Sequence, residues 1–84
     1  MVKSSRQNWD PVKLLRRFFR LTLQQRQLEF LRTAEAAVRL SISEARVRQL
    51  ADAGKLPYVK PTGGRIYIHW PSVLAALEFE ASQR

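Results

Sequence analysis

Two arginines and one glutamine lie in one short helical pattern at residues 43–52, which reads SEARVRQLAD. At 100° per residue, Val47, Leu50 and Ala51 share one apolar face of a helix, which leaves the opposite face to polar side chains. That opposite face carries Ala45, Arg48, Gln49 and Asp52, with Glu44 and Arg46 at its edges. Arginine pairs bidentately with guanine, glutamine pairs with adenine, and alanine meets the thymine methyl group. These residue types at this spacing predict recognition of nucleic-acid bases through hydrogen bonds rather than catalysis.

A second basic position lies at residues 61–65, in the stretch PTGGR between LPYV and IYIHW. The flanking runs are β-branched and aromatic, so they predict a small hairpin with a Gly-Gly turn. Glycine allows positive φ and close approach to another backbone, and arginine supplies charge for a phosphate. The candidate DNA contacts in this hairpin are Lys60, Thr62, Gly64 and Arg65.

Composition narrows the class of protein. A chain of 84 residues supports one modest core, which argues against an enzyme with a deep pocket. It has no cysteine and only one histidine, His69, so we expect no catalytic residue, no metal site and no cofactor, and a reduced, cytoplasmic setting in a bacterium or phage. His69 is expected to be a structural residue at the end of the second hairpin strand.

Charge points to a polyanionic partner. Lysine and arginine total 15 against 7 acidic residues, a net charge of +8, and such a field attracts double-stranded DNA. The same positive charge would also attract an anionic membrane or an acidic protein. The apolar run LLRRFFRL is interrupted by arginines, so it resembles neither a signal-peptide core nor a membrane span. We therefore expect that the partners of this protein do not include a membrane.

The charge is distributed unevenly. Residues 1–27 hold seven basic groups and one acidic group, for +6, whereas residues 28–84 hold eight and six, for +2. We therefore expect a basic N-terminal arm and amphipathic helix over residues 1–27, and a DNA-binding domain over residues 28–84.

The amphipathic helix is predicted at residues 11–20, with Asp10 as its cap and Pro11 at its first position. Three interpretations of its apolar face stay open: packing on the following domain, binding of a neighbouring copy, or contact with a membrane surface. The candidate oligomerisation residues on this face are Leu14, Leu15, Phe18 and Phe19.

Further helices follow from capping signals. Thr22 and Gln25 have capping-box spacing and predict a short helix to about Gln27, after which LEFL is expected to be extended. Thr33 and Ser43 are predicted to cap two helices joined by about three residues, and both are candidate DNA contacts. The second of these helices is expected to end at Gly54, and a closing helix to start near Pro71.

This order of elements predicts a mainly α fold with a small β-hairpin, namely a winged helix-turn-helix preceded by an amphipathic helix. The stretch TAEAAVRLSISEARVRQLADAGKLPYVKPTGGRIYI resembles the excisionases, or recombination directionality factors, and the wider MerR-type winged helix-turn-helix group. The resemblance covers about residues 31–77 and is most specific over residues 33–57. Two departures from the pattern are Ser41, where glycine is common in the turn, and the pair Glu44 and Arg46 in the second helix.

The resemblance implies that Arg48 contacts phosphate or base, that Arg65 is the DNA-facing residue of the wing, and that Ser43 touches phosphate. For Arg46 two interpretations stay open, a DNA contact or an ion pair with Glu35 or Asp52. The remaining aromatic residues, Tyr58, Tyr67 and Trp70, are expected to support the core or the wing rather than to stack on single strands.

The function implied by the resemblance is that of an architectural DNA-binding protein. Such an excisionase binds and bends an attachment site, assembles with copies of itself on adjacent sites, and directs a site-specific integrase. A minimal MerR-type transcriptional regulator is the alternative. An interaction protein, whose basic helix binds a protein or membrane, is a third possibility.

Overall fold

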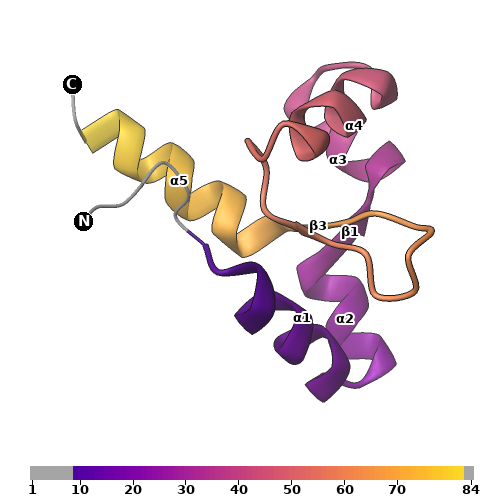
Figure 1. Cartoon of the computed structure of the whole chain (residues 1–84). Coiled ribbons are helices and arrows are strands. Elements are labelled where there is room, and N and C mark those ends of the chain that lie inside the picture. The colour runs from indigo at the N-terminus through magenta and orange to yellow at the C-terminus, as the bar shows by residue number, and fades with distance from the viewer. Residues whose placement is uncertain (1–8, 83–84) are drawn as a thin grey trace.

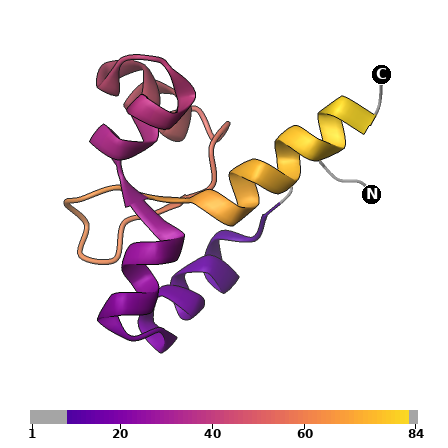
Figure 2. The ribbon, with the colours of Figure 1, turned by 180° about the vertical axis from the view of Figure 1, so that it is seen from behind.

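The computed structural model describes residues 9–82, with side chains up to residue 77. Five helices surround one small antiparallel sheet with strand order β1-β3-β2 (Figures 1 and 2). The elements are α1 (Pro11–Arg20), α2 (Leu23–Glu29), β1 (Phe30–Arg32), α3 (Thr33–Leu40), α4 (Glu44–Asp52), β2 (Tyr58–Val59), β3 (Tyr67–His69) and α5 (Trp70–Ser82). This arrangement is a winged helix-turn-helix, which confirms the predicted fold class. The predicted basic arm falls mostly on residues 1–8, outside the described part of the chain.

The first helices begin where their capping signals lie. Asp10 accepts a hydrogen bond from the amide of Val12 at 2.9 Å, and Pro11 occupies the first position of α1. Thr22 and Gln25 form the predicted capping box of α2. Helix α2 continues two residues beyond the expected end, so only the second half of the LEFL stretch is extended, as β1.

The helix pair α3 and α4 has one cap that differs from expectation. Ser43 caps α4 as predicted, accepting from the amide of Arg46 at 3.1 Å. Thr33 does not cap α3; Arg32 is the N-cap and makes no side-chain capping bond. Thr33 is the first helical residue and is buried, and its hydroxyl donates instead to Glu44 at 2.7 Å. The start of α3 is thus bonded to the start of α4.

The turn between α3 and α4 depends on Ser41, which has a φ of +60°. This left-handed conformation lets the amide of Ile42 donate to the carbonyl of Ala37 at 3.1 Å, which ends α3. An L-residue pays for this conformation in steric strain, which glycine avoids. Serine therefore adopts a geometry that glycine adopts with less strain.

Replacing Ser41 by glycine is expected to raise the free energy of unfolding by about 0.5 kcal/mol, because relief of strain outweighs the added freedom of the unfolded chain. The melting temperature should rise by about 2–4 °C. Thermal unfolding followed by circular dichroism measures both, with Ser41→Val as the opposite case, since a β-branched residue is disfavoured at this φ. A lower stability for Ser41→Gly would show that the serine side chain itself stabilises the turn.

The sheet has one strand more than the predicted hairpin. Strand β3 pairs with β2 as the hairpin and with β1 on its other side, where Phe30 is opposite His69 and Arg32 is opposite Tyr67. The strand immediately before the helix pair therefore lies beside the second arm of the wing, which fixes the wing relative to α3.

The turn of the wing, defined here as residues 60–66, also differs from expectation. The amide of Gly63 donates to the carbonyl of Lys60 at 3.1 Å, with Pro61 and Thr62 between them. Proline at the second position and glycine at the fourth are the residues that such a turn favours. Gly63 has a φ of +80°, but Gly64 has no positive φ, so the predicted Gly-Gly turn is wrong.

Two apolar clusters hold these elements together. The first lies between α3, α4, the sheet and α5, and contains Val47, Ala51 and Ile68, all fully buried. The half-buried Tyr58 and Trp70 pack against it, which confirms their structural role. The second cluster joins α1 to the sheet and consists of Leu14, Phe18, Phe30 and Val59, with Trp9, Leu15, Leu21 and Tyr67 at its margin.

The second cluster corrects the expectation for the apolar face of α1. The Phe18 ring lies 5.1 Å from that of Phe30 and 5.2 Å from that of Tyr67, between ring centroids. Leu14 and Phe18 are buried against the sheet and are not available to a neighbouring copy; Leu15 is half-buried and Phe19 remains exposed. Of the three interpretations of the apolar face of α1, the structure therefore supports packing on the following domain. Helix α2 runs through residue 27, and the division of the chain at that point stays a prediction.

A polar network ties four elements together on the side of the sheet away from the wing turn. Arg17 of α1 donates to Glu29 at the end of α2, with 2.6 Å from Nε to Oε1. Nε2 of His69 lies 3.1 Å from the same carboxylate, and Nδ1 lies 2.6 Å from the hydroxyl of Ser72 in α5. A carboxylate only accepts, so Nε2 carries the imidazole proton and Nδ1 accepts from Ser72. The buried His69 at the end of β3 is thus structural, as predicted.

Acid is expected to destabilise the protein in two steps. Burial lowers the pKa of His69 below 6.5, so the unfolded chain binds that proton more readily and stability falls as the pH drops below that value. The hydrogen bond from Arg17 holds the pKa of Glu29 at about 2 against an ordinary 4.5, so its contribution is complete above pH 4.5 and is lost toward pH 2. Urea unfolding between pH 8 and about pH 2 measures both steps.

Glu29→Gln is expected to cost about 1–2 kcal/mol at pH 7 and to flatten the lower step, since Arg17 is half-exposed and water screens part of the pair. Glu35→Gln is the matched control, because Glu35 forms an exposed pair with Arg39 on the surface of α3 and should change little. A Glu29→Gln profile parallel to that of the wild type would contradict this assignment.

Helix α5 extends away from the rest of the molecule (Figure 1). Val73 is buried in the first cluster, whereas Leu74 and Leu77 are exposed. Within residues 9–82, no helix combines the length and the apolar character needed to cross a membrane.

Candidate nucleic-acid interface

The exposed face of α4 is the one that the sequence predicts. Burial of Val47 and Ala51, both fully inaccessible to solvent, fixes the rotation of the helix about its axis. The face turned to solvent carries four of the candidate DNA contacts, Ala45, Arg46, Arg48 and Gln49. We call α4 the recognition helix from here on.

Arg48 is held in place but not withdrawn from solvent. Its Nη2 donates to Glu44 Oε2 at 3.2 Å, one turn earlier on the same helix, and the arginine side chain is 57% exposed. The same Glu44 oxygen accepts from the buried Thr33 hydroxyl. Thr33 therefore does not present its hydroxyl to a ligand; it orients Glu44, which in turn positions Arg48. Exposed pairs of this kind contribute little free energy, so DNA can displace Glu44.

Arg46 takes neither of the two acidic partners considered for it. Its Nη1 donates to Gln49 Oε1 at 3.3 Å, and Glu35 pairs with Arg39 instead, at 2.9 Å. Within the described side chains, Arg46 forms no ion pair. Arg46 and Gln49 thus form one polar, solvent-facing unit beside Arg48.

The wing and the recognition helix border one open groove of about 250 Å³. Arg48 and Asp52 line it from α4, Lys60, Gly64, Arg65 and Ile66 from the wing, and Arg32 and Thr33 from the junction of β1 and α3. Four cationic side chains therefore face one groove with a single carboxylate. The fold brings together Arg48 and Arg65, 17 positions apart in the sequence. Thr62 is exposed in the wing but does not line this groove, and Ser43 is exposed at the start of α4.

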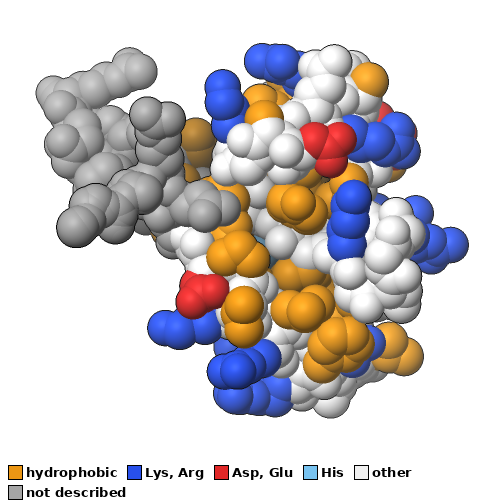
Figure 3. All heavy atoms as spheres, in the orientation of Figure 1, with side chains coloured by type: hydrophobic (Ala, Val, Ile, Leu, Met, Phe, Trp, Pro, Cys, Tyr) orange, Lys and Arg blue, Asp and Glu red, His pale blue; other side chains and the backbone are white. Residues whose placement is uncertain are grey.

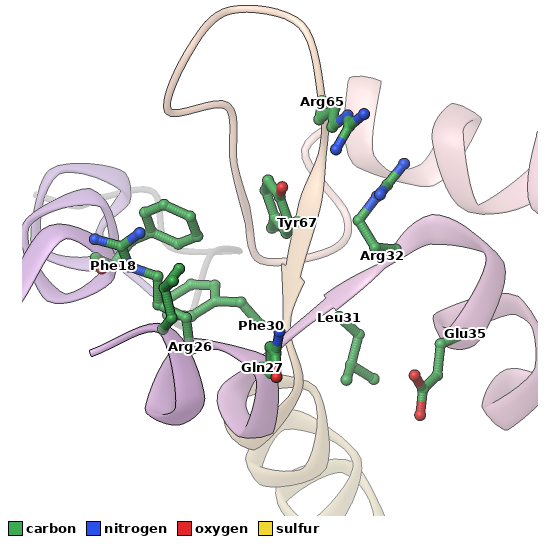
Figure 4. A pocket seen from close by; sticks show the side chains of 10 residues that line it. Phe18, Arg26, Gln27, Phe30, Leu31, Arg32, Glu35, Arg65 and Tyr67 are labelled. Atoms are coloured by element: carbon green, nitrogen blue, oxygen red, sulfur yellow. Dashed lines mark hydrogen bonds between the residues drawn. The ribbon is translucent and has the colours of Figure 1, made fainter. Parts of the chain in front are cut away.

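Arg32 is the functional candidate that sequence reasoning missed. It also lines a larger groove of about 540 Å³ beside α2 and β3, together with Arg26, Arg65, Tyr67 and Phe18. Figure 4 shows the side chains of Arg32 and Arg65 close to each other on the side of this groove nearest the helix pair. Both arginines line both grooves, so they stand between them. The pairing of β1 with β3 places Arg32 beside the wing, and the sequence does not show this pairing. The one signal in the sequence was the position of an arginine directly before the predicted start of a helix.

Nothing in the described part of the chain suggests metal chemistry: residues 9–82 contain no group of three or more histidine, cysteine, aspartate or glutamate side chains arranged to hold an ion. The arrangement instead offers guanidinium, ammonium and amide donors at the surface. These groups suit phosphate oxygens and base edges.

Comparison with known proteins agrees with this geometry. The family model of a helix-turn-helix domain matches residues 30–78, which is more than half of the chain and includes β1, the helix pair, the wing and the start of α5. Neither the curated proteins nor the solved structures contain a match to this chain. Helices α1 and α2 lie before the matched region. The chain therefore belongs to the helix-turn-helix domain family, and it is a DNA-binding protein whose partner is double-stranded DNA.

Proposed function

We propose that this protein is an excisionase-type architectural factor, which binds and bends an attachment site and so directs a site-specific integrase. The observation that carries the proposal is the single cationic groove shared by the recognition helix and the wing. A protein that holds a duplex from its major groove and along the neighbouring backbone can offset the cost of bending, about 1–6 kcal/mol for a short site. The resemblance over residues 33–57 to excisionases supports the same function.

In this proposal the recognition helix enters the major groove. Arg48 and Gln49 contact base edges, Ala45 lies against the groove floor, and Arg46 contacts a base or the adjacent phosphate. The phosphate contacts come from Ser43 at the start of the helix, from Thr62 in the wing, and across the groove from Arg32, Lys60, Gly64 and Arg65. Thr33 acts indirectly, through Glu44.

Cooperative assembly on adjacent sites is part of the proposed function. The exposed apolar side chains Phe19, Leu74 and Leu77 are candidates for contacts between copies, in place of the buried Leu14 and Phe18. Contact with an integrase and a cytoplasmic location remain proposals that follow from the same assignment.

Bending distinguishes this function from simple promoter recognition. The binding site is placed at different positions in a set of DNA duplexes of equal length, and each complex is run on a gel. The mobility of the complex is expected to vary with the position of the site. More than one protein is expected to bind per attachment region. Position-independent mobility with one bound protein would contradict the excisionase assignment. Genome-wide occupancy at many promoters, rather than at the boundary of one mobile element, would identify a transcriptional regulator instead.

A further inference from the structure

The exposed face of α1 carries a row of cations that the recognition surface does not use. Lys13, Arg16, Arg17 and Arg20 recur at intervals of three and four residues, so they share one face of the helix. Arg17 pairs with Glu29, but the other three form no ion pair within the described side chains, and all three are exposed. This row lies outside the region that matches the helix-turn-helix family.

Local stability does not account for these charges. Helix α1 has no acidic residue between Pro11 and Arg20, so like charges adjoin one another along it, and within the row the carboxylate of Glu29 pairs with Arg17 alone. A helix macrodipole favours cations only in the last turn, which explains Arg17 and Arg20 but not Lys13 and Arg16. A face that is merely solvated usually interleaves both signs. The row is therefore better explained by a ligand.

The row lies away from the interface described above. Figures 1 and 2 place α1 and α4 at opposite ends of the molecule, with the sheet between them. In Figure 3, Lys and Arg side chains gather over α1 and are separated from those over α4 and the wing by apolar and neutral surface. The row and the groove of the wing are therefore separate cationic surfaces.

The row is long enough to meet neighbouring phosphates of DNA. Residues 13 to 20 span about 10 Å of helix axis at 1.5 Å per residue, and long side chains at three positions extend from it. A membrane surface fits less well, because a membrane-binding helix inserts its apolar face and here Leu14 and Phe18 are buried in the protein. Charge complementarity and the burial of the apolar face both favour a nucleic-acid strand.

We propose that Lys13, Arg16 and Arg20 form a second, sequence-independent phosphate-binding surface, which holds a segment of duplex DNA other than the one read by α4. This inference rests on the proposed function, since it needs a first duplex in the recognition groove. One protein would then join two segments, from two molecules or from distant parts of one molecule. In an excision complex, such bridging would bring the arms of an attachment region together.

Capture of a second duplex tests the inference. An immobilised duplex, selected by the full chain from a random pool, is saturated with protein and washed, and a labelled duplex of unrelated sequence is added. The wild type is expected to retain the labelled duplex at 50 mM salt. Three phosphate contacts predict that the affinity for it falls about 40-fold between 50 and 200 mM salt.

The matched variants separate this surface from the recognition surface. The triple variant Lys13→Gln, Arg16→Gln, Arg20→Gln is expected to reduce capture at least about 10-fold while changing affinity for the selected duplex less than about 3-fold. The charge-retaining triple variant Lys13→Arg, Arg16→Lys, Arg20→Lys should capture as the wild type does. Arg17 is unchanged in both variants, so the contact with Glu29 and the fold are preserved.

Several outcomes would overturn the inference. If the wild-type protein binds the selected duplex but captures no second duplex, the inference is wrong, and the proposed function is unaffected. Equal capture by the glutamine variant would assign bridging to self-association. If the glutamine variant loses the binding of the wild type to vesicles containing anionic lipid, while its DNA capture is unchanged, the row binds a membrane surface instead. Failure of the proposed function gives a different result, since the selected duplex would then be bound without bending.

Discussion

The double variant Arg48→Ala, Arg65→Ala is expected to bind DNA about 100-fold more weakly than the wild type. The two guanidinium groups face the same groove from the recognition helix and from the wing, so one duplex contacts both. Loss of a base contact costs about 1–3 kcal/mol, and loss of a phosphate contact lowers the salt dependence by about one unit of slope. Titration of the duplex selected from a random pool, at several salt concentrations, measures both quantities.

The single variants of this pair should differ in kind. Arg48→Ala is expected to relax sequence preference, because Arg48 lies on the recognition helix, whereas Arg65→Ala should weaken binding to all sequences about equally. Arg39→Ala is the matched control, since Arg39 is an exposed arginine of α3 that pairs with Glu35 and does not line the groove. Unchanged affinity in the double variant would mean that the DNA lies elsewhere on the molecule, and the interface proposed here would be wrong.

Removing the ring of Phe18 is expected to destabilise the domain by about 3–5 kcal/mol, the usual cost of deleting a buried aromatic side chain. Phe18 is 6% exposed and contacts the rings of Phe30 and Tyr67. Arg26 adds to the cost, because its guanidinium lies 4.6 Å from the Phe18 ring centroid and loses this contact with the ring. Its hydrogen bond to the backbone carbonyl of residue 18 is kept. Small domains have stabilities of about 5–15 kcal/mol, so much of the total depends on this residue.

Phe19 is the matched control for Phe18. It is the next residue along the same helix and is 56% exposed, so Phe19→Ala should change the free energy of unfolding by less than about 0.5 kcal/mol. If Phe18→Ala does not fold, Phe18→Leu keeps the effect measurable at about 1–1.5 kcal/mol. Urea unfolding at two protein concentrations gives the result. A loss of stability that depends on concentration would show that Phe18 contacts another copy.

Local signals were sufficient for most of the helices. The cap at Asp10, the capping box at Thr22 and Gln25, and the cap at Ser43 each satisfy amides of the helix that follows, and the structure shows all three. The alternation of apolar and polar positions in α4 likewise predicted which side chains face solvent. Such features depend on residues three or four positions apart, and the sequence alone contains that information.

Features that depend on distant partners were not predictable. Thr33 looked like a cap because it precedes an apolar helix, yet its hydroxyl bonds to Glu44 of the next helix. The turn of the wing, from Lys60 to Gly63, is different: it follows the local preference for proline at the second position and glycine at the fourth, so the wrong prediction there was a missed local signal. The apolar face of α1 had three possible partners, and periodicity cannot choose among them.

The sequence by itself determined the type of protein: a small basic chain with a helix pair, a wing and arginines on an exposed helical face. Only the tertiary structure decided which cations act together. Pairing of β1 with β3 brings Arg32 beside Arg65 and opposite Arg48, while docking of α1 buries Phe18 and leaves Lys13, Arg16 and Arg20 exposed at the other end of the molecule. The physical reason is that a shared groove depends on strand pairing and side-chain packing between segments far apart in the chain, and no local pattern encodes their relative position.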